Sequence, residues 1–352
     1  MRKLFFSIIP HIIAWVLAYT FYALLIYLVL VDRDETGSVR AFGLAQIIAW
    51  GVYVGIFIGF LLGLIDQLIL KKVINAKQSI GVVVLLKSLI YSLTILLTIV
   101  IGIITWVNVY DAETFFEKLF QSKFRFTSTF IYSIFITILI NFVSQVNRKF
   151  GPGILLPMFF GKYHQPKVEK RIFMFLDLKD STPYAEQLGH IKFSQLIQDC
   201  FHDLNLIVSD YKAEIYQYVG DEAILSWTPQ KGIEDLNCIA IFFAYQELLT
   251  NNATEYQRKF DLIPEFKAGV NIGEATIAEV GDVKREIAYH GDVLNTAARI
   301  QGVCNQFGKS LLISEKLKKL LPDSDQFKNE LVGEIPLKGK SKPVKIFSFD
   351  KH

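Results

Sequence analysis

The sequence predicts a chain of two parts, an α-helical domain that spans a membrane four times and a mixed α/β domain. Three observations lead to this fold class. Hydrophobic residues make up 52% of the 352 residues, a high share for a wholly soluble protein. The excess is concentrated before residue 147, in four long apolar runs. From residue 171 onward, short apolar segments alternate with segments of helical periodicity.

Charge and cysteine content exclude several other classes. The net charge is only +3, so no basic field predicts a nucleic-acid partner. The three cysteines lie far apart in the second part, which predicts reduced thiols in a cytosolic domain. Their spacing predicts neither a disulfide framework nor a zinc site. They are Cys200, Cys238 and Cys304.

The first part, residues 1–147, contains four apolar runs that can each cross a bilayer, since a spanning helix needs about 20 residues. The first run is too long for the core of a signal peptide and lacks a small-residue cleavage site, so we interpret it as a span. The fourth is the most polar, with Asn141 and several Ser and Thr residues. The predicted spans are Leu4–Val31, Ala41–Leu70, Ile80–Val107 and Thr127–Val146.

Basic residues predict the orientation of these spans, because Lys and Arg collect in cytoplasmic loops. They precede the first span, separate the second from the third and follow the fourth, whereas the other two loops are mainly acidic. We therefore expect a multi-pass protein of the inner (plasma) membrane, with both termini and the second part in the cytoplasm. The basic residues are Arg2, Lys3, Lys71, Lys72, Lys77, Arg148 and Lys149.

Two ionisable residues fall near the cytoplasmic ends of the second and third spans. Asp66 and Lys87 are expected at similar depth across a short turn, so we predict that they pair. The pair could respond to a signal. The preferred interpretation is that both side chains snorkel to the interface. His11 is too isolated in the sequence to interpret, and a satisfied interfacial histidine is the default expectation.

Residues 148–170 are expected to form a linker. Repeated glycine and proline make a continuous helix from the fourth span into the second part unfavourable. These residues are Gly151, Pro152, Gly153, Pro157, Gly161 and Pro166.

The second part, residues 171–352, predicts strands and helices in the order β-α-β-β-α-β. This order favours a ferredoxin-like α/β core with additions. The elements are a strand at 171–178, a helix at 184–211, a hairpin at 213–227, a helix at 233–249, a strand pair at 266–280 broken by Gly273 and Glu274, a helix opening at 291, and strands near 310–313 and 344–349.

Two aspartates mark the ends of central strands in this core. Asp177 ends the first strand, and Asp221 follows Gly220 in the turn of the hairpin. In a split β-α-β sheet these strands are neighbours, so the two carboxylates are expected to meet. Close carboxylates repel each other unless a cation lies between them, and Mg²⁺ is typically held by one or two carboxylates plus phosphates. Taken singly, each is also compatible with an ordinary turn aspartate.

A third element adds groups that can bind a nucleotide. Asn295 and Arg299 are four residues apart and therefore share one face of the predicted helix. Arginine offers a bidentate fork to phosphate, and asparagine can hold a sugar hydroxyl or ring oxygen. The alternative for this pair alone is an exposed polar helix face.

Four segments in this order and spacing resemble the catalytic domain of class III adenylate/guanylate cyclases of the membrane-anchored, bacterial type. The resemblance covers about residues 170–350. It implies a nucleoside triphosphate substrate, two Mg²⁺ or Mn²⁺ ions per site, and sites at the interface of a head-to-tail homodimer. The segments are FLDLKDST, YVGDEAILSW, HGDVLNTAARI and LKGKSKPVKIFSF.

The resemblance also implies roles for single residues in binding metal and phosphate. Asp177 and Asp221 match the metal-binding aspartates, and Leu178 is assigned to the same metal site and, through its backbone, to the start of the turn described next. The turn that follows matches the one that cradles the β- and γ-phosphates; it comprises Lys179, Asp180, Ser181 and Thr182. Lys338 matches a lysine that contacts the terminal phosphates.

The roles implied for the helix concern catalysis. Asn295 matches the residue that orients the ribose, and Arg299 the one that stabilises the transition state. Both would come from one subunit, whereas Asp177 and Asp221 would come from the other. The implied reaction is attack of the ribose 3′-hydroxyl on the α-phosphorus with loss of pyrophosphate.

Two positions that select the purine depart from the family pattern. Adenylate cyclases commonly carry lysine where Gln217 stands, and Asp or Thr where Ala288 stands. The glutamine amide can both donate and accept, but alanine offers no side-chain hydrogen bond. ATP is favoured as the commoner substrate of bacterial members. GTP or relaxed specificity stays open.

Three alternatives from other classes remain. The chain could be a catalytically weak, nucleotide-responsive membrane regulator, although all expected metal, ribose and transition-state residues are present. The segment VGDEAI superficially resembles diguanylate cyclases, which the Asn/Arg helix and the LKGK strand fit poorly. A transporter with a regulatory tail would also need spans, but Asp66 and Lys87 are thin evidence for an ion path.

Overall fold

The computed structural model describes residues 2–32, 44–70, 79–109, 123–150, 161–283, 285–336 and 343–351. Its contacts divide the chain into two units, Met1–Phe150 and Gly151–His352. The predicted linker lies partly outside the described residues, so its extent stays a prediction.

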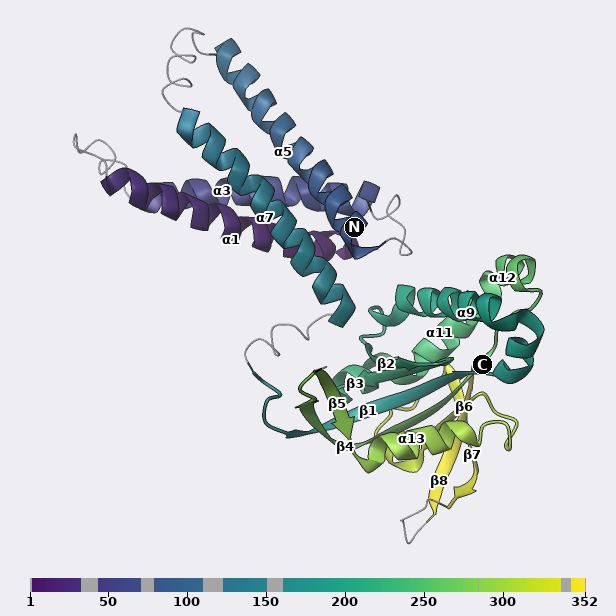
Figure 1. Ribbon diagram of the computed structural model, residues 1–352. Helices are drawn as coiled ribbons and strands as arrows, with labels where there is room; N and C mark the ends of the chain where they lie inside the picture. The colour runs from purple at the N-terminus through teal and green to yellow at the C-terminus, as the bar shows by residue number, and fades with distance from the viewer. Residues whose placement is uncertain are drawn as a thin grey trace. The chain divides into compact units, whose positions relative to one another are not determined.

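The first unit is built from long apolar helices (Figure 1). Its elements are α1 (Arg2–Asp32), α3 (Leu44–Ile65) with a π-helical extension η1 (Asp66–Leu70), α5 (Ile80–Val109) and α7 (Lys123–Phe150). Within the described ranges, four segments are long and apolar enough to cross a membrane, which confirms the predicted helical architecture. They are Ile8–Val29, Leu44–Leu70, Gly81–Val100 and Thr127–Asn147.

A row of glycines brings α3 into close contact with α1. Gly51, Gly55, Gly59 and Gly63 are spaced four residues apart and are all buried. A Cβ on Gly55 would lie only 2.5 Å from the Cα of Val16. Small residues at this spacing let the backbones of membrane helices approach, where packing rather than water exclusion drives association.

Gly55→Leu is therefore expected to separate α1 from α3. The new side chain would overlap the backbone of α1, and overpacking of this kind typically costs about 1–3 kcal/mol or more. The thermal stability of the detergent-solubilised chain measures the effect. Gly81→Leu is the matched control, because a Cβ on Gly81 meets nothing within 4 Å. Equal melting temperatures for the two variants would contradict the packing role of Gly55.

The polar residues of α7 form hydrogen bonds with α1. The Tyr19 hydroxyl lies 3.1 Å from Oγ of Ser133, and the Tyr132 hydroxyl donates to the carbonyl of Ala18 at 2.6 Å. An apolar surrounding makes an unpaired polar group costly, so such groups tend to meet across helices. These contacts account for part of the polarity of the fourth span, whose Asn141 instead donates to Ser88 of α5.

Asp66 and Lys87 form the predicted ion pair, but the snorkelling interpretation is wrong. The two residues are only 3% and 5% exposed, inside the bundle rather than at its surface. His11, which is isolated in the sequence, has a partner in the structure, because its Nε2 lies 3.6 Å from Oδ2 of Asp66. The sequence pattern did not show how the helices rotate toward one another.

The second unit contains an eight-stranded sheet in the order β2-β3-β1-β4-β6-β8-β7, with β5 paired to β4. The first four strands pair antiparallel, as in a ferredoxin-like core, and confirm the predicted α/β fold. The elements are β1 (Lys167–Leu178), α9 (Ser181–Val208), β2 (Glu214–Val219), β3 (Glu222–Trp227), α10 (Pro229–Ile233), η2 (Glu234–Leu236), α11 (Asn237–Asn251), α12 (Ala253–Phe260), β4 (Phe266–Val280), β5 (Glu286–His290), α13 (Asp292–Gly302), β6 (Leu311–Ser314), α14 (Glu315–Lys318), β7 (Phe327–Ile335) and β8 (Val344–Lys351).

The predicted strand pair at 266–280 is instead one continuous strand, β4. Gly273 does not break this strand. Its lack of a side chain instead lets α13 pack closely on β4, since a Cβ at Gly273 would lie 3.1 Å from Cβ of Val293. Gly269 plays the same part further along, where a Cβ would overlap the backbone of Gln301. The helix therefore rests almost directly on the strand.

Helices cover both faces of the sheet, α9 and α11 on one side and α13 on the other (Figure 1). Successive side chains of β1 alternate between these faces. Met174 and Leu176 pack under α9 and α11, whereas Phe173 and Phe175 pack under α13. Asp177 continues the second row and so belongs to the face of α13.

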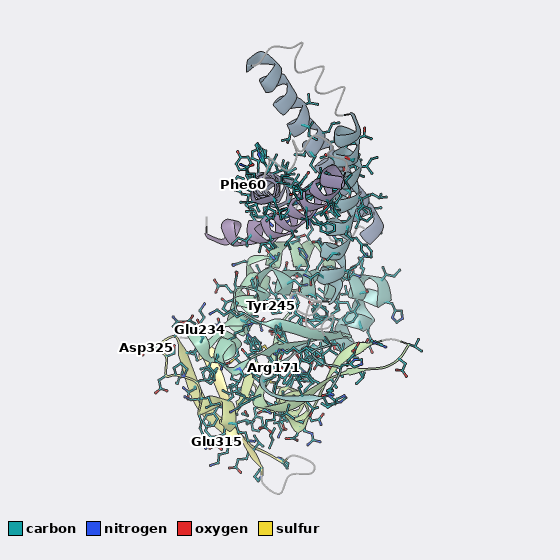
Figure 2. All side chains as sticks on the ribbon, turned by 90° about the vertical axis from the view of Figure 1, so that its left-hand side faces the viewer. Phe60, Arg171, Glu234, Tyr245, Glu315 and Asp325 are labelled. Atoms are coloured by element: carbon teal, nitrogen blue, oxygen red, sulfur yellow. The ribbon has the colours of Figure 1, made fainter. Side chains whose placement is uncertain are left out.

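The interior of this unit also holds a buried arginine. Figure 2 shows Arg171 among the strands and Tyr245 nearer the helices. The guanidinium of Arg171 donates to Oγ of Ser226 at 3.0 Å and to the carboxylate of Glu214. Its charge is thus compensated within the sheet, as a buried charge must be.

Candidate active site

The structure brings Asp177 and Asp221 to the same end of neighbouring strands. In the antiparallel register, Asp177 on β1 lies opposite Glu222 on β3 and Lys267 on β4. Asp221 stands in the turn between β2 and β3, directly after Gly220, whose φ of +61° favours glycine. The turn places Asp221 next to the residue that faces Asp177.

These carboxyl groups influence one another. Burial and the nearby charge of Asp221 raise the pKa of Asp177. Burial, together with the charges of Asp177 and Asp221, raises the pKa of Glu222 to about 7. Three acids therefore share one corner of the sheet, and their repulsion favours a cation among them.

Two partners offset part of this repulsion. Nζ of Lys267 lies 3.3 Å from Oδ2 of Asp177, and Nε2 of Gln301 donates to the same oxygen at 2.9 Å. Among the residues that the structure describes, no three Asp, Glu, His or Cys side chains form a complete metal cage. A Mg²⁺ or Mn²⁺ ion held by Asp177 and Asp221 and completed by substrate phosphates fits this donor set.

The segment after Asp177 forms a tight turn into α9. Leu178 is buried at the end of β1, and the side chain of Lys179 reaches Oε2 of Glu265 at 3.0 Å. Asp180 adopts a left-handed conformation, with φ of 54°, and its side chain does not cap the helix. The first N–H groups of α9, beginning at Ser181 and Thr182, can therefore receive an anion.

Asn295 and Arg299 lie on the face of α13 that points away from the sheet. Both are exposed, whereas Ala297 and Gln301 on the same helix are buried against it. Arg299 lines a pocket of about 630 Å³ together with Glu334 and other residues around the end of β7. One chain therefore does not direct Asn295 and Arg299 at its own Asp177.

The two predicted base-selecting positions lie on β2 and β5. Gln217 is exposed and follows a β-bulge at Tyr216, and Ala288 is partly buried. β2 and β5 are not neighbours in the sheet, yet their tyrosines meet: the ring centroids of Tyr216 and Tyr289 are 4.7 Å apart. The backbone N–H of Tyr289 also donates to the Tyr216 hydroxyl at 3.3 Å. Lys338 lies outside the described residues.

The sequence family described as the adenylate and guanylate cyclase catalytic domain matches residues 163–350, more than half of the chain. The chain belongs to this family. Adenylate cyclase 2 of Rhizobium meliloti (strain 1021) is 31% identical over 207 residues, which cover 59% of this chain and 57% of that protein. An adenylate cyclase of Anabaena cylindrica is 24% identical, covering 49% of this chain and 35% of that protein. The chain thus spans little more than half of the first relative and about a third of the second.

A solved structure shares the fold of the cyclase domain. A bacterial light-regulated adenylyl cyclase aligns with a TM-score of 0.52 at 19% identity, covering 61% of this chain and 64% of that one. The aspartates of the sheet, the α13 residues and the turn before α9 all fall within the matched residues 163–350.

Sequence reasoning missed three residues at this corner of the cyclase domain. Glu222 stands next to Asp221, but its direction depends on the strand register with Asp177. Gln301 is two residues beyond Arg299, and only the helix packing shows that it turns inward. Lys267 looked like an ordinary strand residue. The alternation of inward- and outward-facing side chains along β1 and β4 was the signal that could have indicated that Lys267 lies beside Asp177.

The raised pKa of Glu222 predicts how the stability of the metal-free cyclase domain depends on pH. Between the ordinary value of 4.5 and the folded value of about 7, the folded state holds a proton that the unfolded chain has released. The free energy of unfolding should therefore decrease as pH rises through this window. Melting in chelator at about pH 5 and about pH 7.5 measures the decrease, which Glu222→Gln should make smaller. An equal decrease in both proteins would contradict the assignment.

Proposed function

We propose that this chain is a membrane-anchored nucleotide cyclase that converts ATP to 3′,5′-cyclic AMP and pyrophosphate. The observation that carries the proposal is the meeting of Asp177 and Asp221 at the end of adjacent central strands. Membership of the cyclase family supports the reaction class. The 31% identity to an adenylate cyclase supports ATP as substrate.

The described residues suit a triphosphate substrate. The N-terminal turn of α9 would accept the β- and γ-phosphates. Lys338, which lies outside the described residues, would offset part of the negative charge of the phosphates. Asp177 and Asp221 would hold Mg²⁺ or Mn²⁺, two ions per site, which when bound lower the pKa of the attacking hydroxyl and neutralise phosphate charge. Asn295 would orient the ribose.

Arg299 would act at the α-phosphate, where negative charge builds up during attack. A guanidinium held at this position stabilises the transition state more than the bound substrate. Because Arg299 and Asn295 point away from the sheet of their own chain, we infer that they serve the aspartates of a second copy. The working enzyme would then be a homodimer with two composite sites.

Base selection is the part of the proposal with a real competitor. The exposed amide of Gln217 can pair with adenine or guanine, and Ala288 adds no side-chain hydrogen bond. Relaxed specificity, with GTP as a second substrate, is therefore the alternative that these two residues favour. A catalytically weak regulator is the further alternative.

The membrane part would anchor the enzyme in the inner (plasma) membrane. We infer an orientation with both termini in the cytoplasm, where nucleoside triphosphates are available. The proposed domains are a membrane domain at 1–147, a linker at 148–170 and the catalytic domain at 171–352.

A product assay on the detergent-solubilised full chain tests the proposal. ATP and GTP are offered separately, each with Mg²⁺ and with Mn²⁺, and Asp221→Ala is the control. We expect cyclic AMP from ATP, less cyclic GMP from GTP, and neither from Asp221→Ala. Cyclic GMP as the main product would show that GTP, not ATP, is the preferred substrate. Absence of any cyclic product would refute the proposed cyclase activity.

A further inference from the structure

The buried carboxylate of Asp66 is shared by two basic side chains from different helices. Nζ of Lys87 on α5 donates to Oδ1, and Nε2 of His11 on α1 lies 3.6 Å from Oδ2. Each oxygen of the carboxylate thus faces one nitrogen. The three residues link α1, η1 and α5.

Helix packing fixes His11 in this position. The glycine row of α3 ends at Gly63, where a Cβ would lie 3.3 Å from Cβ of His11. Three residues further, the chain leaves α-helical geometry and begins the π-helical turn at Asp66.

The three side chains differ in how far they are buried within the bundle. The side chains of Asp66 and Lys87 are 4% and 7% exposed, whereas that of His11 is 19% exposed. The aspartate and lysine balance each other's charge. Imidazole ordinarily titrates near pH 6.5, so a proton on His11 would add a net charge that the pair does not compensate.

The surroundings of His11 contain few other titratable groups. Within the described parts of the bundle, Asp66 of η1 and Tyr91 of α5 contact His11, and Lys87 of α5 pairs with the other oxygen of Asp66. The neighbouring part of α3 presents Gly59 and Gly63, which carry no charge. A proton on His11 would therefore change the net charge of this cluster by one.

We propose that His11, Asp66 and Lys87 form a proton-binding site in the membrane part, with His11 as the group that takes up the proton. Proton binding strengthens the attraction between His11 and the Asp66 carboxylate, in competition with the ion pair that Asp66 forms with Lys87. The change reaches α7 through the next residue of α5, because Nδ2 of Asn141 donates to Oγ of Ser88 at 3.2 Å.

All of these residues lie near one end of their spans. His11 is three residues inside the span that starts at Ile8, Asp66 four residues before Leu70, and Asn141 six residues before Asn147. At about 1.5 Å per residue, they lie within about 5–9 Å of the span ends. This is the end of α7 from which the chain continues to the catalytic unit, so we infer that the site adjusts cyclase output, a step that rests on the proposed function.

The first experiment measures protonation without any need for enzyme activity. The full chain, labelled with ¹⁵N-histidine, is placed in lipid nanodiscs and followed by NMR, and the signal missing in His11→Gln is assigned to His11. We expect a reversible titration between about pH 5 and about pH 8. Its midpoint should differ in the double variant Asp66→Leu/Lys87→Leu, which removes both buried charges together and so avoids leaving one unpaired. A His11 signal that is constant over this range, or a midpoint that the double variant leaves unchanged, would overturn the site.

The second experiment measures coupling to the cyclase. Cyclic nucleotide production by the wild-type chain is divided by that of His11→Gln at each pH, which cancels the pH dependence of the catalytic domain itself. We expect this ratio to change about fivefold between about pH 5.5 and about pH 8. His190→Gln, a change at an exposed residue of α9, is the matched control, and the ratio to it should stay flat. A ratio for His11→Gln that does not change with pH, together with a clear NMR titration, would overturn the coupling between the site and the cyclase. Absence of product in every variant would instead contradict the proposed function.

Discussion

Replacing Arg299 by alanine is expected to lower kcat for ATP by about 10²–10³, the usual cost of losing one group that stabilises transition-state charge. KM should change little, because the proposed role of the guanidinium is exerted mainly in the transition state. Initial rates of cyclic AMP formation over a range of ATP concentrations separate the two parameters.

Two further variants sharpen this test. Arg299→Lys keeps the charge but not the fork, so it should recover only part of the lost rate. Arg285→Ala removes another exposed arginine of the same domain, which lies 3.8 Å from Glu279, and should leave kcat nearly unchanged. Near-normal turnover in Arg299→Ala would show that α13 has been assigned the wrong role.

Mixing two inactive variants should restore activity if each site is composite. Asp221→Ala lacks an aspartate, and Arg299→Ala lacks the arginine, so neither homodimer has a complete site. A mixed dimer has one complete site and one doubly deficient site. After subunit exchange at equal concentrations, about a quarter of wild-type activity is expected, because half of the dimers are mixed and each carries one of two sites.

The control mixture combines Asp177→Ala with Asp221→Ala. Both changes affect the aspartate side of the site, so every dimer should remain inactive. Failure of the Asp221→Ala and Arg299→Ala mixture to recover activity, with exchange verified by tagged subunits, would place the whole site within one chain.

The elements that sequence periodicity encodes were predictable. The four candidate membrane-spanning helices follow from the length and apolarity of their runs, and the core order follows from alternating strands and helices. The proximity of Asp177 and Asp221 was also predictable, because the topology of a split β-α-β sheet makes their strands neighbours.

What could not be predicted depends on how elements rotate and pack. The burial of Asp66 and Lys87, and the approach of His11, depend on which faces the membrane helices turn toward one another. The glycines of α3 were a readable signal for that packing. Gly273 was predicted to break the strand. The requirement for glycine there comes from the packing of α13 on β4, which the sequence of the strand alone does not show. The roles of individual site residues stay predictions.

The glycines under α13 have a consequence for how the proposed dimer works. With Gly269 and Gly273 beneath it, the helix lies close to β4, and the Asn271 side chain between these glycines donates to the carbonyl of Val293 on α13. Asn295 and Arg299 are therefore presented on a stiff support whose orientation is settled during folding. Formation of the composite site would then require mainly the correct docking of the two subunits, because the positions of Asn295 and Arg299 within each subunit would need little rearrangement.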